Sequence, residues 1–193
     1  MENLVAVIQI DKIYSGGPSI IKMEPKGDSR GTFMRVFCID EFKDAGIAFN
    51  PKQCNLSKST SPGTLRGLHF QYKPKCESKY VRVLSGSIFD VVVDLNPGEN
   101  FLRVETFTIS SKENSGVFVP KGFAHGFQTL EGNTSVEYLV DEKYDAQHES
   151  GLRWNDPKLG ISWPAEVSCI SDRDNGHDFL VDAKLIELEN RFK

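Results

Sequence analysis

The sequence predicts a mainly β fold, either a sandwich or a barrel, with a few short helices at its periphery. The first observation is a series of short segments in which apolar and polar residues alternate, as in half-buried strands. The second is the Gly, Pro, Asn and Asp residues that separate these segments, which are typical of turns. The third is that strand and helix patterns do not alternate regularly, which argues against parallel β/α units. With no linker and no internal repeat, the 193 residues fit one domain over 1–193.

The N-terminal part is predicted to contain short strands and one helix. Residues 4–10 form an apolar run typical of a strand, and the Gly and Pro residues at 16–18 interrupt it. Alternation and turn residues then predict a strand at 19–22, a turn at 27–31, a strand at 32–37 and a short helix at 40–45 that ends at Gly46.

The remainder is dominated by strand patterns. Strands are predicted at 53–57, 64–70, 79–84, 87–95, 102–109, 117–119, 124–129 and 135–140. Turns are predicted at 85–86 and 96–98, and the alternation in 102–109 changes phase after Thr106, which suggests a bulge. Residues 179–191 have apolar positions on one stripe and are predicted to form a closing amphipathic helix.

The segment 64–70 combines an arginine, a glycine and a histidine within one predicted strand. Arg66 and His69 are three residues apart, so a regular strand would point them to opposite faces. A bulge at Gly67, or a close approach by another backbone there, would bring both side chains to one side. A strand with a solvated arginine and a hydrogen-bonded core histidine is the structural alternative on these residues alone.

Composition limits the classes of function. The net charge is −4 and the Lys and Arg residues are scattered, which gives no support for nucleic-acid binding. The four cysteines are widely spaced without a Cys-x-x-Cys pair, which fits a reducing compartment better than a disulfide framework or a zinc site. No run approaches membrane-spanning length, and the N-terminus lacks a signal-peptide pattern. We therefore expect a cytoplasmic protein without a membrane or nucleic-acid partner.

Several common catalytic motifs are missing. The four histidines lack the arrangement of two His one residue apart, followed by a carboxylate, that metal-binding double-stranded β-helices usually have. A metal centre built from His69, His125 and distant acids is a minor alternative. No Gly-rich loop opens a helix, and no nucleophile elbow is present.

Several motifs together resemble one family. They are Arg66-Gly67-Leu68-His69-Phe70, Lys79, Gly86 to Val91, Ala124-His125-Gly126-Phe127, Tyr138 and Gly151 to Pro157. In order and spacing, from about residue 28 to about residue 175, they are similar to the dTDP-4-dehydrorhamnose 3,5-epimerases, a metal-free branch of the cupin superfamily. The resemblance implies a cupin-type double-stranded β-helix, or jelly-roll barrel, with no cofactor. It also implies an isomerase that inverts C3, C5 or both in a nucleoside-diphospho-4-keto-6-deoxyhexose.

The resemblance implies roles for four catalytic residues. His69 would be the base, because an imidazole exchanges protons readily near neutral pH. Asp174 would orient it, although neighbouring Asp172 is distinguished from Asp174 only by the family pattern. Lys79 would stabilise the developing O4 anion, and Tyr138 would return a proton from the opposite face. The structural alternatives are an ion pair of Lys79 with Asp90, and a core tyrosine at 138.

Other residues match positions that contact the substrate in the family. Tyr144 and Phe33 match aromatic positions that stack on the base, and Arg66 and Arg30 match diphosphate contacts. The remaining expected pocket residues are Gln53, Asn55, Asp90, His125 and Arg153.

One position departs from the family pattern. Arg35 stands where the family usually has a glutamate, and a guanidinium can donate but cannot accept a hydrogen bond. If Arg35 faces the base, a base rich in acceptors, such as cytosine, would suit the site better than thymine; the alternative is that Arg35 points to solvent. The substrate is therefore expected to be dTDP- or CDP-linked.

The resemblance leaves further alternatives open. A sugar-nucleotide 3,4-ketoisomerase and a non-catalytic sugar-nucleotide-binding cupin belong to the same superfamily. The family's usual state is a homodimer that exchanges N-terminal strands, which the run at 4–10 would suit. The expected role is in deoxysugar biosynthesis for surface polysaccharide such as the O-antigen of lipopolysaccharide.

Overall fold

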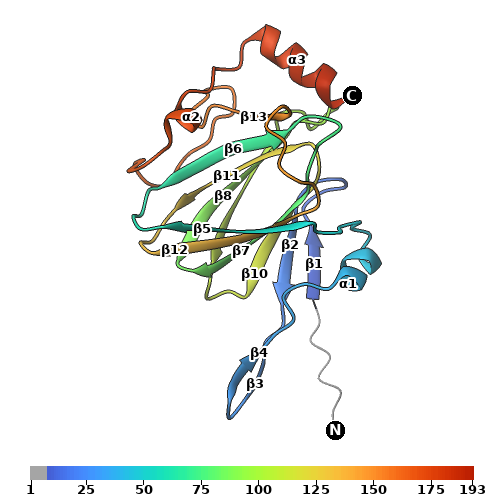
Figure 1. Cartoon of the computed structure of the whole chain (residues 1–193), viewed down its shortest axis with the longest axis vertical. Helices are drawn as coiled ribbons and strands as arrows, with labels where there is room; N and C mark the ends of the chain where they lie inside the picture. The colour runs from blue at the N-terminus through green and yellow to red at the C-terminus, as the bar shows by residue number, and fades with distance from the viewer. Residues whose placement is uncertain (1–7) are drawn as a thin grey trace.

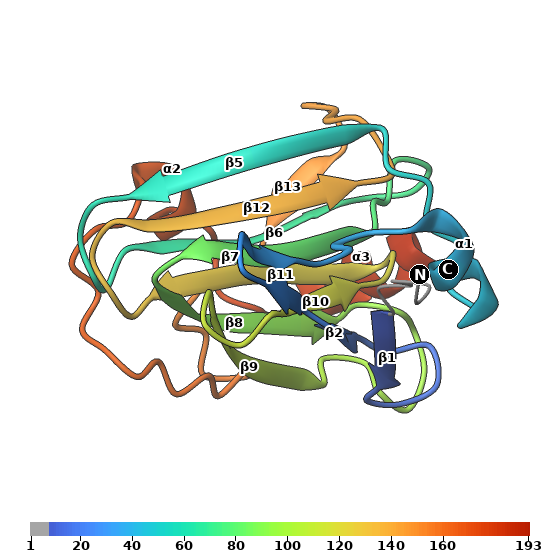
Figure 2. The same ribbon diagram turned by 90° about the horizontal axis from the view of Figure 1, so that it is seen from below.

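Two antiparallel β-sheets face one another in the computed structural model, which describes residues 8–193 (Figures 1 and 2). The larger sheet has the strand order β1-β2-β10-β7-β12-β5, with β1 Ile8–Lys12, β2 Ser19–Met23, β10 Ser115–Val119, β7 Lys79–Ser85, β12 Thr134–Val140 and β5 Gln53–Ser59. The smaller sheet has the order β13-β6-β11-β8-β9, with β13 Glu149–Gly151, β6 Leu65–Gln71, β11 Phe123–Thr129, β8 Ser87–Asp94 and β9 Val104–Ser110. The architecture confirms the mainly β prediction.

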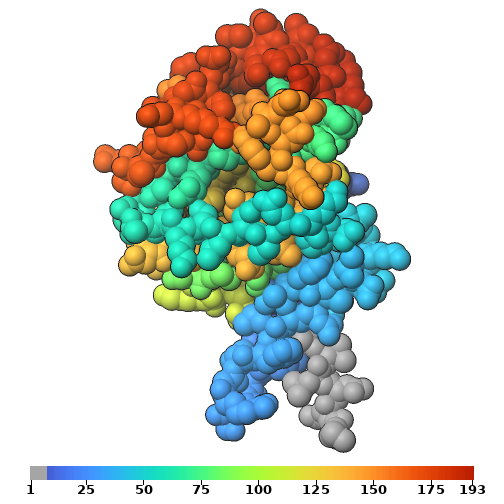
Figure 3. Space-filling view, in the orientation of Figure 1, coloured from blue at the N-terminus to red at the C-terminus, as the bar shows by residue number. Residues whose placement is uncertain are grey.

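The helices and one hairpin lie outside the two sheets. The helices are α1 (Ile39–Asp44), α2 (Asp172–Asn175) and α3 (Asp182–Phe192). The strands β3 (Lys26–Asp28) and β4 (Gly31–Phe33) form a two-stranded hairpin. This hairpin projects from the body of the protein, at the lower end of the views in Figures 1 and 3. Within residues 8–193, no helix is long and apolar enough to cross a membrane.

Three apolar clusters hold the layers together. One fills the space between the sheets and is rich in β-branched side chains, such as Val81, Val92 and Val136, which pack well on pleated surfaces. A second, which includes Leu188 and Phe192, packs α3 on the outer face of the smaller sheet. The third, around Phe42, packs α1 on the outer face of the larger sheet. The outer faces of both sheets are therefore partly covered, one by α3 and the other by α1.

Most predicted strands are present, with ends that differ by at most two residues. The helix predicted at 40–45 is α1, and the helix predicted at 179–191 begins later, at Asp182. The strand predicted at 32–37 is wrong beyond Phe33, because β4 ends there and no strand within residues 8–193 pairs with the residues that follow. The predicted bulge after Thr106 is also wrong, since β9 pairs with β8 in one continuous register. Of the strand predicted at 4–10, residues 4–7 lie outside the described residues.

Candidate active site

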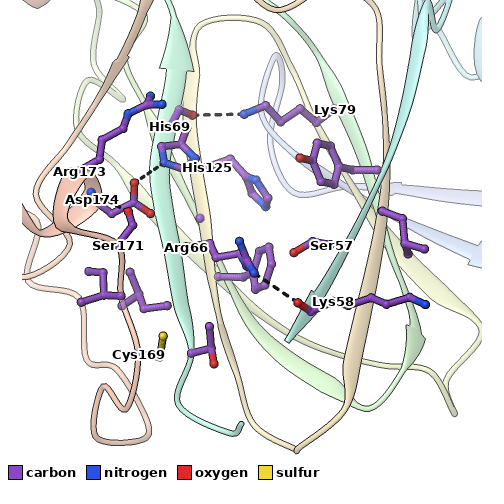
Figure 4. Close-up of a pocket in the computed structure, with 17 residues that line it drawn as sticks. Ser57, Lys58, Arg66, His69, Lys79, His125, Cys169, Ser171, Arg173 and Asp174 are labelled. Carbon is purple, nitrogen blue, oxygen red and sulfur yellow. Dashed lines mark hydrogen bonds and ion pairs between the residues drawn. The ribbon is translucent and has the colours of Figure 1, made fainter. Parts of the chain in front are cut away.

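A cavity of about 650 Å³ lies between the two sheets, and its lining includes all four residues predicted to be catalytic (Figure 4). His69 comes from β6 of the smaller sheet, whereas Lys79 and Tyr138 come from β7 and β12 of the larger sheet. Asp174 comes from α2, which lies against β6. The volume is in the range of pockets that bind small molecules. The two sheets and one short helix therefore converge on a single pocket.

The bulge expected at Gly67 is present and explains how His69 and Arg66 reach the same cavity. His69 lies opposite His125 and Arg66 lies opposite Phe127, so Gly126 alone faces both Gly67 and Leu68. Because of this extra residue, the side chains of Arg66 and His69 point to the same face of the sheet, and both line the cavity. Gly67 has a φ of +110°, and a Cβ there would lie 2.6 Å from the Cα of Gly126. The close backbone approach therefore requires a glycine.

His69 and Asp174 form a hydrogen-bonded dyad at the cavity wall. Nε2 of His69 lies 2.7 Å from Oδ1 of Asp174, and the backbone N–H of Gly67 donates to Oδ2 at 3.0 Å. Burial by itself would raise the pKa of Asp174, but the hydrogen bonds from His69 and Gly67 outweigh it, so the net pKa is lowered. Asp174 is therefore an ionised acceptor, which favours a proton on Nε2 of His69. Nδ1 is then the ring nitrogen available as a base.

α2 fixes the position of Asp174. The helix begins after Ser171, whose hydroxyl accepts a hydrogen bond from the backbone N–H of Asp174. This N-cap turns the Asp174 side chain inward, where it is 7% exposed, while Asp172 is exposed. Of the two aspartates, Asp174 is the one that is buried and contacts His69.

Lys79 is held at the opposite wall, although not by the partner considered from the sequence. Its ammonium donates to the carbonyl oxygen of His69 at 3.3 Å and lies 3.2 Å from Oε1 of Glu77. The alternative of an ion pair between Lys79 and Asp90 is wrong. Asp90 is wholly buried and instead contacts His125, with 2.7 Å between Oδ1 and Nε2. His125 lines the cavity, and Asp90 lies behind it without lining it.

Tyr138 is half-buried and faces the cavity from the larger sheet. Burial raises the pKa of its phenol above the ordinary value; nearby Arg66 lowers it and Glu77 raises it further. A phenol with a raised pKa keeps its proton at neutral pH. Tyr138 can therefore act as a proton donor in this cavity.

A smaller cavity of about 220 Å³ adjoins the first and shares His69, Lys79 and Tyr138 with it. Gln53, Asn55 and Tyr144 line it, as expected for pocket residues. The hydroxyl of Tyr144 donates to Glu149 at 2.6 Å, and Glu149 also forms an ion pair with Arg173, which lines the larger cavity. This network connects the rims of the two cavities.

Two predicted pocket residues lie on the projecting hairpin, away from both cavities of the described chain. Arg30 donates to Asp28, with its side chain 87% exposed, and Phe33 is 66% exposed.

Two more predicted pocket residues are engaged elsewhere in the chain. Arg35 forms an ion pair with Glu41 of α1 and lines neither cavity. Arg153 donates to the backbone oxygen of Asn175 at 2.6 Å and stacks on Phe179, with 4.9 Å between the guanidinium carbon and the ring centre. Arg153 therefore braces the segment after α2 and does not line either cavity.

The sequence-based prediction missed five charged residues that line the two cavities: Lys58 and Arg173 in the larger cavity, and Glu77, Glu142 and Glu149 in the smaller one. Arg173 lies beside Asp174 in the same short segment, and its guanidinium points to the cavity side of α2 (Figure 4). Glu77 lies in the irregular segment just before β7 and lines the smaller cavity with Lys79. No periodicity in the sequence marks it, because it lies outside the strand. Among residues 8–193, no three His, Cys, Asp or Glu side chains cluster in a way that could hold a metal ion.

Comparison with known proteins identifies one family. The model of the dTDP-4-dehydrorhamnose 3,5-epimerase family matches residues 15–182. The chain is 36% identical over 179 residues to the dTDP-4-dehydrorhamnose 3,5-epimerase of Sinorhizobium fredii, covering 89% of this chain and 92% of that protein. It is 41% identical over 174 residues to the enzyme of the same description from Methanothermobacter thermautotrophicus, covering 88% and 93%.

Solved structures give the same result. The dTDP-4-dehydrorhamnose 3,5-epimerase of Bacillus anthracis, with TDP and PPi bound, superposes with a TM-score of 0.87 at 36% identity, covering 90% of this chain and all of that one. A Legionella pneumophila epimerase in complex with dTDP-4-keto-L-rhamnose gives 0.84 at 32% identity, covering 93% and 97%. A 3'-monoepimerase from Streptomyces bikiniensis in complex with dTDP-quinovose gives 0.82 at 30% identity, covering 90% and 88%. These likenesses confirm the expected cupin-type jelly roll.

Proposed function

The chain belongs to the dTDP-4-dehydrorhamnose 3,5-epimerase family and is an isomerase of deoxysugar biosynthesis, and from this premise we propose how its residues act. The substrate is a dTDP-linked 4-keto-6-deoxyhexose, and the reaction inverts one or both of the carbons C3 and C5. The observation that carries the proposal is that the His69–Asp174 dyad, Tyr138 and Lys79 line one cavity. A pocket that only binds a nucleotide sugar has no need of a base, its orienting acid and a separate proton donor.

His69 removes the proton from the carbon next to the ketone. The C4 carbonyl acidifies the protons on C3 and C5, and Nδ1 of His69 accepts one of them while Nε2–H stays bonded to Asp174. The carboxylate stabilises the imidazolium that forms and keeps the ring in one orientation, as in other His–Asp pairs. General base catalysis of this kind contributes roughly 10²–10⁴-fold to a rate.

Lys79 and Tyr138 complete the inversion. The electron pair of the broken C–H bond moves into the carbonyl, and the O4 enolate that forms is stabilised by the Lys79 ammonium, a contribution of about 3 kcal/mol in a water-excluded site. Tyr138 then donates its phenolic proton to the same carbon from the other face, which inverts the centre. His69 returns its proton to solvent and the Tyr138 phenolate takes one from solvent, so the protein ends as it began.

We propose that the nucleoside of the substrate is thymidine. Cytidine had been an alternative only because Arg35 stands where the family usually has a glutamate. Arg35 pairs with Glu41 and lines neither cavity, so the argument for an acceptor-rich base loses its basis. TDP is bound in the related Bacillus anthracis structure. Arg66 and Arg173 line the larger cavity and supply the cations that a diphosphate requires, and Tyr144 supplies an aromatic ring beside the smaller cavity. The test compares the rates of deuterium exchange into dTDP-linked and CDP-linked 4-keto-6-deoxyhexoses. We expect the faster exchange with the dTDP-linked substrate.

We further propose that the working form is a homodimer, in which the β3–β4 hairpin of one copy completes the cavity of the other. The support is the projection of this hairpin from the body and the exposure of Arg30 and Phe33 on it (Figure 3). Phe33→Asp should lower the affinity for TDP without unfolding the chain. Mixing Phe33→Asp with His69→Asn chains should restore some activity, because one of the two mixed sites is then intact. No gain on mixing would contradict the proposal.

Solvent deuterium exchange tests the reaction itself. In heavy water, wild-type protein with a dTDP-4-keto-6-deoxyhexose should incorporate deuterium at C3, C5 or both, as read by mass spectrometry and NMR. His69→Asn should abolish incorporation while the Kd for TDP stays within about threefold. A variant that keeps most of its exchange rate would remove His69 from the role of base.

The same experiment separates the neighbouring chemistries. A ketoisomerase would move the carbonyl to another carbon, which the carbon NMR spectrum of the product reports directly. A catalytically silent binding protein would bind TDP but incorporate no deuterium at all. Inversion with the ketone still at C4 is the outcome that we expect.

A further inference from the structure

Glu77 is a carboxylate of the site that the proposed reaction has not used. It lies in the segment before β7, and its side chain is only 10% exposed. It lines the smaller cavity together with His69, Lys79 and Tyr138, the three residues that the two cavities share. Buried carboxylates are costly unless they are paired, so a negative charge at this place requires a reason.

Only one of the two carboxylate oxygens of Glu77 has a partner. Oε1 lies 3.2 Å from the ammonium of Lys79, whose side chain is likewise 10% exposed. Oε2 is buried and has no hydrogen-bond partner among residues 8–193. A carboxylate with a purely structural role normally has both oxygens satisfied. The incomplete pairing therefore indicates that the charge of Glu77 matters at this position for another reason.

The charge of Glu77 also reaches the proton donor. The phenol of Tyr138 has a raised pKa, mainly because of burial; Arg66 lowers this pKa and Glu77 raises it. Other charged or titratable groups face the two cavities from the surrounding elements: Lys58 on β5, Arg66 and His69 on β6, Lys79 on β7, His125 on β11, Glu142 and Tyr144 after β12, Glu149 on β13, Cys169 before α2, and Arg173 and Asp174 on α2. Beside burial, the groups that shift the pKa of Tyr138 are Arg66, which lowers it, and Glu77, which raises it.

We propose that Glu77 is a positioning residue for the proton transfers, whose carboxylate anchors the Lys79 ammonium beside O4 and sets a negative charge near the Tyr138 phenol. This inference rests on the proposed function. The anchor keeps the ammonium in place before the enolate forms, so little reorganisation is needed when negative charge develops on O4. The negative charge disfavours the phenolate, so Tyr138 keeps the proton that it must deliver.

The test compares Glu77→Gln with Glu77→Asp. The glutamine variant keeps the size and one acceptor oxygen but loses the charge, whereas the aspartate variant keeps the charge on a shorter side chain. Glu142→Gln is the matched control, because Glu142 lines the same cavity but pairs with Lys52 at 3.0 Å, not with Lys79. Two quantities are measured over pH: the rate of net inversion, and the ionisation of Tyr138 from the ultraviolet difference spectrum between each variant and the same variant carrying Tyr138→Phe.

Removal of the charge should move both curves to lower pH. We expect Glu77→Gln to lower turnover about tenfold at neutral pH with little change in the Kd for TDP. Its phenol should ionise at lower pH than in the wild type, and the alkaline loss of inversion should shift with it. In Glu77→Asp, which keeps the charge, the phenol should ionise close to the pH seen in the wild type. Glu142→Gln should change neither the turnover nor the titration of the phenol.

Failure of this inference can be told apart from failure of the proposed function. The spectroscopic titration requires no turnover, so it reports on Glu77 even if the wild type catalyses no inversion. An unchanged Tyr138 titration in Glu77→Gln would overturn the inference, as would an equal shift in Glu142→Gln. A Glu77→Gln variant that melts well below the wild type while its titration is unchanged would assign Glu77 a structural role only.

Discussion

The replacement Asp174→Asn tests the dyad most directly, because the carboxylate makes two hydrogen bonds that an amide cannot both replace. Oδ1 accepts from Nε2 of His69 at 2.7 Å and Oδ2 accepts from the backbone N–H of Gly67 at 3.0 Å. The amide has one oxygen, so its N–H₂ group must face either His69 or Gly67. The loss of a charge-assisted hydrogen bond to the imidazolium costs about 1.5–3 kcal/mol, which corresponds to roughly 10–150-fold in rate. An amide N–H that faces Nε2 would also impose the wrong tautomer.

We therefore expect deuterium incorporation to fall by about 100-fold in Asp174→Asn. The assay is incorporation from heavy water into the dTDP-linked substrate, followed by mass spectrometry at saturating substrate. Asp172→Asn is the matched control, since Asp172 lies in the same helix but is exposed and should leave the rate unchanged. If Asp174→Asn keeps a third or more of the wild-type rate, or if both variants lose the same amount, the role given to this carboxylate is refuted.

Three further predictions follow from the same contacts. Tyr138→Phe should lower net inversion by about 100-fold while proton removal, measured as deuterium wash-in, stays within about fivefold of wild type; unchanged inversion would reject Tyr138 as the acid. Gly67→Ala should lower the free energy of unfolding by about 3 kcal/mol, because φ is +110° and the new Cβ would lie 2.6 Å from the Cα of Gly126; urea unfolding measures this, and a loss below about 1 kcal/mol would contradict it. Folding lowers the pKa of Asp174, so its ionised carboxylate stabilises the folded protein. This stabilisation is fully present above the pKa of the unfolded state, about 4, and is lost as pH falls through the pKa of the folded state. Urea unfolding should therefore show the stability advantage of wild type over Asp174→Asn shrinking below about pH 4, and an advantage that grows there would be inconsistent with this sign.

The strands that the sequence predicted best are those buried between the two sheets. In β7 and β8, the β-branched side chains and the turn at Gly86 predict the same strand ends, and the observed ends agree with them within about one residue. The strand predicted at 32–37 stops at Phe33, because alternation of apolar and polar residues does not by itself provide a partner strand, and none within residues 8–193 pairs with the residues after Phe33. Local pattern alone does not specify the neighbour that a strand requires.

Residues that line the cavity from strands were easier to predict from the sequence than residues whose position depends on the path of a loop. The family resemblance pointed to His69, Lys79 and Tyr138, each in a predicted strand, and the structure brings all three to one cavity. Arg153 belongs to an equally distinctive motif, but its guanidinium is taken up by the backbone oxygen of Asn175. Such a contact depends on the path of the chain after α2, which no periodicity in the sequence encodes. Residue type and motif identify a charged side chain, and the tertiary path decides what it contacts.

The bulge at Gly67 connects the fold to the chemistry through a single backbone group. In a regular ladder the N–H of a residue on β6 would pair with the neighbouring strand; in this structure the N–H of Gly67 donates to Asp174. The same irregularity turns Arg66 and His69 to one side of the sheet. One extra residue therefore supplies the donor that fixes the orienting carboxylate and also aims the histidine that this carboxylate binds. Deleting Gly67 would restore a regular register and leave Arg66 and His69 two residues apart, still on one face of the strand. It would also remove the backbone N–H that holds Asp174, so the deletion should lower deuterium exchange even though His69 and Arg66 keep a common face.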